Sequence, residues 1–424
     1  MRQTSVLSLL LLLVLGLVLA GCDSGPSVLV PDGGDRPPPT DPVYFHEDVL
    51  PILAEHCLMC HSAGGIAPFE LRTYDDAVEV GERMAEATRS RIMPPFVVDA
   101  SGDCNHYTNA RRLEDAEIEV IGDWVAGGML EGDPTTPVPP TVTLPTLDRV
   151  SSTLDIGVQY EPDHSITDDY RCFVVEPDWT GIKYITGADV RPGNAEIAHH
   201  LIVFAPVSAA EGARARRLDG SDGRPGYQCF GDAVVTALPV VLWAPGAGAQ
   251  RYPEGTGIQL DGSVPLIVQM HYNLLADNGE PDRTHVDLTL EDRVDTEAWM
   301  GLVADFGLEI PPRMPSFTNE YEGNIAFGPG GAYRVWGAFP HMHTMGRQLR
   351  VEAMDAASTC MVDVPRWDFN WQGAFWYQTP IDLEPNQPMR LSCTYDSMER
   401  DGTTYWGDST QDEMCLSFFY VTRR

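Results

Sequence analysis

Two proline-rich stretches divide this 424-residue chain and constrain how it can fold. Residues 22–42 have the composition of a flexible tether, and residues 133–149 that of a semi-rigid linker. Between them, apolar residues recur at helical spacing, and the last predicted helix ends at Gly127-Gly128. Beyond the linker, apolar and polar residues alternate, and turns rich in Gly and Pro separate many short segments. The sequence therefore predicts a small helical unit over residues 43–132 and then a mainly β region of β-sandwich type.

The first 21 residues predict a secretory signal, because their apolar run is too short to span a membrane and small residues precede Cys22. Leu19-Ala20-Gly21-Cys22 resembles the bacterial lipoprotein box, which implies cleavage before Cys22 and lipidation of its thiol. An ordinary cleaved signal with a stray Cys is the alternative. We expect a protein of the cell envelope, on its periplasmic or extracellular face, that meets the membrane only through this lipid. The formal net charge of −34 argues against nucleic acid as a partner.

A short motif in the helical unit predicts a covalently attached cofactor. Cys57-Leu58-Met59-Cys60-His61 has the C-x-x-C-H spacing of c-type haem attachment, in which two thiols form thioethers and the His becomes an axial iron ligand. A zinc half-site or a disulfide is the alternative. The segment also resembles the small cytochrome c-like domains that are fused to many bacterial envelope enzymes. We therefore expect one haem c in this unit.

The sixth ligand of this haem is expected to be Met93, because Pro94 and Pro95 hold its backbone rigidly. A Met/His pair of axial ligands raises the reduction potential of a haem. Met84 and His106 are the competing candidates, and packing in the core is the simpler explanation for Met84.

Five histidines and one methionine stand in apolar, strand-like segments further along the chain: His199, His200, His271, His341, His343 and Met414. Imidazole suits copper, zinc, iron and nickel, whereas a thioether favours Cu(I), so this set predicts copper in two separate sites. His341 and His343 are two residues apart and would share one face of a strand. His199 and His200 would face opposite sides, so a shared metal there requires a bulge, a twist or a strand end.

The order and setting of these six residues resemble the copper type II monooxygenases, the family of peptidylglycine α-hydroxylating monooxygenase and dopamine β-hydroxylase. In that family an HH pair and a later His before Tyr bind one copper, while an H-x-H pair and the Met of a DEMC motif bind the other. The resemblance covers residues 150–424 and implies two jelly-roll-like β-sandwich domains, over 150–292 and 293–424, with one copper each. It assigns His199, His200 and His271 to the first copper, and His341, His343 and Met414 to the second.

The resemblance also implies disulfides in both sandwiches. They fall on Cys172 with Cys229 and on Cys393 with Cys415. The alternative for Cys415 is a blue-copper ligand, but such a site needs two His around the Cys, and no His follows it. The sequence leaves open whether Cys104 and Cys360 pair, which would staple the helical unit to the second sandwich.

The activity that the resemblance implies is hydroxylation of a C–H bond in a small organic substrate by O2. The copper of His341, His343 and Met414 is then the catalytic site, and the three-His copper stores an electron. Ascorbate supplies the electrons in the animal relatives. Here we expect the haem c to deliver them, from an electron-donor protein or a small reductant. The alternatives are a non-enzymatic haem and copper electron carrier or copper-handling lipoprotein, and a binding or scaffold lipoprotein.

The substrate is the least specified part. The Arg and the polar pattern with which the peptidylglycine enzymes hold a carboxylate are missing, so we expect an apolar or aromatic substrate near Phe339 and Phe418. The aromatic run over residues 367–377 either lines a pocket or packs between the sheets.

Overall fold

The computed structural model describes residues 41–63, 67–230, 232–274, 278–328, 330–407, 409 and 411–424. The predicted signal and Cys22 lie outside these residues, so lipidation stays a prediction. A helical part comes first along the chain and a mainly β part follows, as predicted, although one helix lies among the strands. In the described part, no helix is long and apolar enough to cross a membrane.

The helices of the N-terminal part are a π-helical turn (η1, Phe45–Val49), α1 (Leu50–His56), α2 (Tyr74–Arg89) and α3 (Asp115–Ala126). Capping boxes begin two of them: Thr73 pairs with Asp76 at α2, and Glu114 with Glu117 at α3. Gly127 ends α3, as the sequence predicts. Phe45, Leu53 and Trp124 are fully buried in the core that these helices share. A small helical unit is therefore present, although nothing in its backbone identifies its cofactor.

The first group of strands and one helix follow the linker. They are β1 (Ser152–Asp155), β2 (Asp168–Val175), β3 (Ile182–Arg191), β4 (Ala198–Pro206), α4 (Ala209–Leu218), β5 (Tyr227–Gln228), β6 (Ala237–Trp243), β7 (Gln250–Arg251), β8 (Thr256–Asp261), β9 (Leu266–Asn273) and β10 (His285–Glu291). The second group is β11 (Thr296–Ala304), β12 (Glu309–Ile310), β13 (Phe317–Gly323), β14 (Tyr333–His341), β15 (Gly346–Ala353), β16 (Cys360–Val364), β17 (Phe375–Leu383), β18 (Met389–Tyr395), β19 (Thr404–Tyr405) and β20 (Leu416–Arg423).

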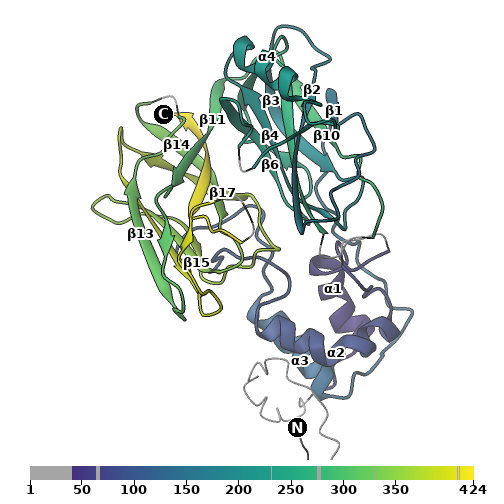
Figure 1. The fold of residues 1–424 in the computed structure, drawn as a ribbon. Coiled ribbons are helices and arrows are strands. Elements are labelled where there is room, and N and C mark those ends of the chain that lie inside the picture. The colour runs from purple at the N-terminus through teal and green to yellow at the C-terminus, as the bar shows by residue number, and fades with distance from the viewer. Residues whose placement is uncertain are drawn as a thin grey trace, which may run out of the picture. The chain divides into compact units, whose positions relative to one another are not determined.

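These strands form two sandwiches that share one sheet. The shared sheet has the order β1-β10-β3-β8-β11-β20-β14-β17, with β7 paired to β3. A five-stranded sheet, β5-β2-β9-β4-β6, packs on its first half, and a four-stranded sheet, β13-β18-β15-β16, packs on its second half. In Figure 1 the first sandwich is drawn mainly in teal and the second in green to yellow.

The junction between the sandwiches is a parallel pair of strands, β8 and β11, in which Thr256 faces Thr296. The predicted boundary at residues 292–293 falls between β10 and β11. The expectation of two β-sandwiches is confirmed, but they are joined by backbone hydrogen bonds rather than by a linker alone.

Side-chain alternation on β9 explains where a site can form. Val268 and Met270 point into the first core, so Gln269 and His271 lie on the opposite face of the five-stranded sheet. This opposite face of the five-stranded sheet can therefore carry the side chains of a metal site.

Three disulfides hold the described part of the chain. Cys172–Cys229 and Cys393–Cys415 form as the resemblance implied. Cys104 pairs with Cys360 at the start of β16, which answers the question that the sequence left open. The segment that follows α2 is therefore covalently attached to the second sandwich.

Candidate metal centre

The three-His set comes from two neighbouring strands of one sheet. His200 on β4 lies directly opposite His271 on β9. The register shifts between Ala198 and His200, so His199 is the extra residue of a β-bulge. The bulge turns His199 to the same side as His200 and meets the condition that the sequence set for two adjacent ligands.

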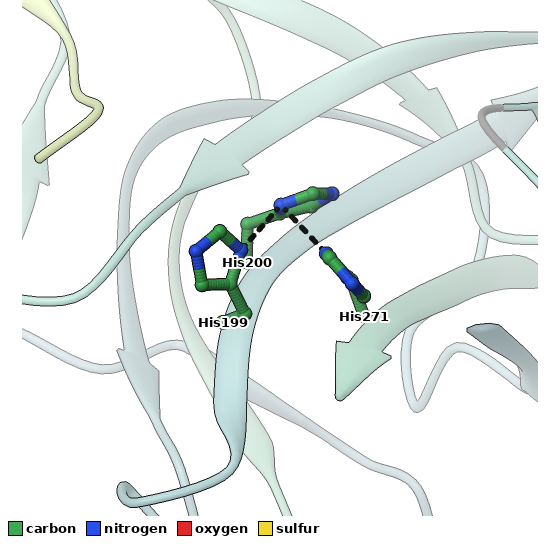
Figure 2. A group of neighbouring side chains, drawn as sticks. All are labelled: His199, His200 and His271. Atoms are coloured by element: carbon green, nitrogen blue, oxygen red, sulfur yellow. Dashed lines mark hydrogen bonds between the residues drawn. The ribbon is translucent and has the colours of Figure 1, made fainter. Parts of the chain in front are cut away.

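The ring nitrogens of this set converge on one point. The Nδ1 atom of His200 lies 3.3 Å from Nδ1 of His199 and 3.2 Å from Nδ1 of His271. Figure 2 shows the three rings with these nitrogens turned toward one another. A neutral imidazole has one lone pair and one N–H, so three Nδ1 atoms this close cannot all satisfy each other by hydrogen bonding. A bound cation that accepts three lone pairs fits the arrangement.

The protonation of these rings also suits a metal. Burial lowers the pKa of His199 to about 4 and holds the pKa values of His200 and His271 well below their usual range. The rings are therefore neutral near pH 7, which is the form that ligates metals. His271 Nε2 lies 2.9 Å from Asp168 Oδ1, so its proton sits there and its Nδ1 is free.

His199 Nε2 is buried without a hydrogen-bond partner among the described residues. Its ring stacks instead on Phe369, with centroids 4.4 Å apart. The donor chemistry of the set thus fits a copper ion held by three imidazoles.

The second set differs from the expected strand geometry. His341 is the last residue of β14, and His343 lies beyond the end of the strand. The prediction that both stand on one strand is therefore wrong, because β14 ends before His343. The backbone still alternates: Met342 is fully buried in the second core, and the two imidazole centroids are 5.1 Å apart.

Acceptors fix both rings of this set. His341 Nδ1 lies 2.5 Å from Gln372 Oε1, and His343 Nδ1 lies 3.2 Å from the carbonyl oxygen of Asp412. Each Nδ1 therefore donates its proton and each Nε2 is left for a metal. Burial lowers the pKa of His341 to about 3 and that of His343 to about 4, so both rings are neutral near pH 7.

Met414 stands just before β20, and its backbone is tightly held. Tyr395 Oη donates to the Met414 carbonyl at 2.9 Å. The next residue, Cys415, is bonded to Cys393 on β18. The thioether side chain is 6% exposed and lines the same cavity as His341.

Glu413 is a positioning residue that the sequence reasoning missed. Its buried carboxylate accepts backbone N–H groups of His343 at 2.9 Å, Met345 at 2.6 Å and Met414 at 3.2 Å. Burial raises the pKa of Glu413 to about 7, against the lowering effect of these donors. The signal for Glu413 in the sequence was its place directly before Met414 in the DEMC motif.

One cavity of about 570 Å³ connects the two sets. His200, His341, His343 and Met414 line it, and the ring centroids of His200 and His341 are 6.0 Å apart. The remaining lining is largely apolar and includes Leu201, Phe204, Leu242, Trp243, Phe339, Leu416 and Phe418. None of the described residues that line it is Lys or Arg. The two sets therefore share a largely apolar cavity, and no Lys or Arg among its described lining residues could hold a carboxylate.

The aromatic run at residues 367–377 mostly packs. Trp367, Phe375 and Tyr377 are buried in the second core, and none of the run's aromatic residues lines the 570 Å³ cavity among the described residues. Packing is thus the better interpretation for Trp367 and Tyr377, whereas Trp371, Phe375 and Trp376 line a separate cavity of about 300 Å³.

The C-x-x-C-H motif forms a tight turn after α1. The backbone N–H groups of Cys60 and His61 both donate to the Cys57 carbonyl, at 3.1 and 2.9 Å. Cys57 and Cys60 are the free cysteines of the described chain, and burial raises the pKa of the Cys57 thiol to about 12. His61 Nδ1 lies 3.1 Å from the Phe69 carbonyl, which leaves Nε2 for a metal. The motif keeps the groups that haem attachment needs.

Met93 and Met84, two candidates for the sixth haem ligand, lie in different surroundings. Met93 lines a cavity of about 330 Å³ together with Leu113 and Ile118. Within the described residues, that cavity includes none of Cys57, Cys60 and His61. Met84 is buried in the helical core. The role of Met93 stays a prediction.

Comparisons with known proteins find similarity in the β region of the chain. Residues 301–422 match the family described as Copper type II ascorbate-dependent monooxygenase, C-terminal domain. This match and the relatives that follow support a relationship of this chain to the copper type II monooxygenase family. The chain is 24% identical to human DBH-like monooxygenase protein 1 over 54% of this chain and 40% of the relative. It is 23% identical to tyramine beta-hydroxylase of Caenorhabditis briggsae over 64% and 46% of the two chains.

A third relative is horse (Equus caballus) dopamine beta-hydroxylase, 26% identical over 66% of this chain and 48% of the relative. The chain thus spans less than half the length of these relatives. Among solved structures, the major capsid protein P2 of bacteriophage PM2 is similar at 9% identity and a TM-score of 0.25, over 64% of this chain and 97% of that chain. So low a score supports no conclusion about fold or function.

Proposed function

We propose that this chain is a copper-dependent monooxygenase that hydroxylates a C–H bond of a small organic substrate with O2. The observation that carries the proposal is the shared cavity. Two ligand sets of different chemistry, three imidazoles and two imidazoles with a thioether, open onto one apolar space of about 570 Å³. The relatives named as dopamine and tyramine hydroxylases support the same reaction class.

In this proposal the copper of His341, His343 and Met414 supplies the O2 chemistry, and the copper of His199, His200 and His271 supplies an electron. The residues around them hold the rings in place. Gln372 and the Asp412 carbonyl keep the protons of the His341 and His343 rings on Nδ1, and Asp168 does the same at Nε2 of His271.

The cavity wall serves substrate binding. Phe339, Phe418 and Leu416 offer apolar surface beside the second set, so an apolar or aromatic substrate displaces water from the reacting atoms. With no Lys or Arg among the described lining residues, no basic side chain there pairs with an anionic substrate.

Electron supply completes the proposal. We assign haem c to Cys57, Cys60 and His61, with Met93 as its sixth ligand and with an electron-donor protein or a small reductant such as ascorbate outside. A lipid on Cys22 anchors the protein in the cell envelope. The free thiols and the hydrogen bond from His61 Nδ1 to Phe69 support the attachment.

The test is incorporation of ¹⁸O from ¹⁸O2 into an aromatic or alicyclic product by the full-length, copper-loaded protein. One ¹⁸O atom per product supports the monooxygenase. Reduced protein that consumes O2 without labelling any of a panel of apolar substrates would favour the second candidate, an electron-transfer or copper-handling lipoprotein.

The haem assignment has its own test. His61→Ala is expected to abolish turnover with cytochrome-type donors while leaving activity with chemical reductants. Equal loss with both kinds of donor would contradict electron delivery through the haem.

A further inference from the structure

A cavity of about 330 Å³ lies where the helical unit meets the second sandwich. Part of its wall comes from the end of α2 and from residues within 93–101 and 111–118. Another part comes from the start of the loop between β16 and β17, where Arg366 donates to the Ser90 carbonyl at 2.9 Å. A ligand in this cavity would therefore contact both parts of the chain.

Basic side chains gather in this cavity, although the chain as a whole is strongly acidic. Lys and Arg number 28 in the sequence against 62 Asp and Glu, and four of the 28 line this one cavity: Arg91, Arg111, Arg112 and Arg366. The acidic residue in the described lining is Asp99. Its carboxylate already accepts the backbone N–H of Ser101 at 3.0 Å and the hydroxyl of Ser101 at 2.9 Å. The described lining is therefore positively charged.

Only one of the four arginines forms an ion pair with a carboxylate of the described chain. Arg91 pairs with Asp115, whereas Arg366 and Arg111 donate to backbone carbonyls. The side chain of Arg112 has no hydrogen-bond or ion-pair partner among the described residues, and its Nε atom is buried. A partly buried guanidinium without a counter-charge is costly, and an anion in the cavity would supply that charge.

The rest of the lining determines which kind of anion fits. It is largely apolar and includes Met93, Pro94, Phe96, Val97, Val98, Ala100, Leu113, Ile118 and Pro365. A cavity of this size suits a small organic molecule, and its apolar wall adds to the affinity only for a ligand with an apolar body. A carboxylate matches the planar fork of a guanidinium with two parallel hydrogen bonds. The lining thus favours an organic acid over an inorganic ion.

We propose that the 330 Å³ cavity is a binding site for a small organic carboxylate, held by Arg111 and Arg112 with its ring or chain against the apolar wall. The inference goes beyond the proposed function, because neither copper nor haem takes part in the binding. No Lys or Arg is among the described residues that line the copper-ligand cavity, so the two cavities bind ligands of different charge.

The test is isothermal titration calorimetry of the full-length, copper-loaded protein with 2-naphthoate as the probe. 2-Naphthamide, of nearly the same shape but neutral, shows any binding that does not depend on charge. Arg112→Gln should weaken the binding of 2-naphthoate about tenfold, because a charge-assisted pair is lost, and should leave that of 2-naphthamide unchanged. Inorganic phosphate should bind more weakly than 2-naphthoate, since it has no apolar body.

The free energy of unfolding separates a binding role from a structural one. Arg112→Gln breaks no described hydrogen bond or ion pair of this side chain, so denaturant unfolding should match wild type. Arg111→Gln should also weaken 2-naphthoate binding about tenfold and keeps the test decisive if the first variant does not fold. Arg217→Gln, on the exposed side of α4, is the matched control and should bind as wild type does.

Three results would overturn the site. One is the absence of 2-naphthoate binding to the wild-type protein, and another is tighter binding of phosphate than of 2-naphthoate. The third is wild-type affinity for 2-naphthoate in the arginine variants that fold. None of these results depends on hydroxylation, so each can be told apart from a failure of the proposed function, which shows in metal content and in ¹⁸O incorporation.

Discussion

The two ligand sets are built in different ways, although they face one cavity. The three-His set stands on β4 and β9, two paired strands inside one sheet, and a single bulge brings the third ring in. The His341, His343 and Met414 set stands at and beyond strand ends, where a buried carboxylate and a disulfide hold the backbone. Sheet pairing therefore positions the first set, and side-chain bonds position the second. Substitutions of residues that are not ligands should therefore weaken metal binding more at the second set than at the first.

The sets also differ in which nitrogen is left for a metal. In the first set Nδ1 atoms converge, and Asp168 occupies Nε2 of His271. In the second set Gln372 and the Asp412 carbonyl occupy Nδ1, so Nε2 is free. Substitutions of these partners should therefore affect one set and spare the other.

The largest effect is expected from loss of a ligand in either set. His271→Ala and Met414→Leu should each reduce ¹⁸O incorporation to background, because the proposed reaction needs both coppers. Each should nevertheless retain one copper per chain, measured by elemental analysis after dialysis. Loss of both coppers in either variant would show that the sets are one coupled site rather than two.

The next largest effects are expected from removing the disulfides of the two sandwiches, and the two removals should differ in their effect on copper binding. Removing Cys393–Cys415 or Cys172–Cys229 by paired Ser substitutions should lower the free energy of unfolding by about 2–5 kcal/mol in each case. Only the first pair adjoins a ligand, Met414, so only its removal should also weaken copper binding at the second set. Denaturant unfolding and copper titration check this, and equal copper losses in the two double variants would contradict the account.

Glu413→Gln tests the carboxylate that joins three backbone N–H groups. The neutral amide accepts more weakly and brings N–H groups of its own, so the copper affinity of the second set should fall about 10- to 100-fold. The three-His copper should be unaffected in a competitive chelator titration. Glu320→Gln, on the exposed side of β13, is the matched control. An equal fall at both sets would mean that Glu413 acts through overall stability.

The smallest effect is expected for Asp168→Asn. The amide can still accept from His271 Nε2, but without the charge that raises ligand basicity, so affinity at the three-His set should fall by roughly tenfold. The second set should keep wild-type affinity in the same chelator titration. A change confined to the second set would contradict the assignment of Asp168.

The sequence predicts the individual helices and strands better than it predicts how they pack and pair with one another. Alternation over β10 and β15 and the stop at Gly127 follow from local patterns that single strands and helices must satisfy. The need for a bulge at His199 could be derived because adjacent strand residues face opposite sides. These predictions need no knowledge of distant contacts.

What the sequence did not reveal depends on long-range pairing. The parallel contact of β8 with β11 carries no local signal, so the shared sheet was not foreseen. The bonds of Glu413 and Gln372 join residues far apart in the chain, so the sequence alone does not identify the partner of either side chain. The Cys104–Cys360 pair was undecided for the same reason.

Metal content per chain tests the central claim most directly. The full-length wild-type protein, loaded with copper and freed of excess metal, is analysed for copper, zinc and haem. Two ligand sets and one C-x-x-C-H motif predict two copper ions and one haem per chain. One copper, or zinc in place of copper, would contradict the assignment of two copper sites, and absence of haem would contradict the electron supply.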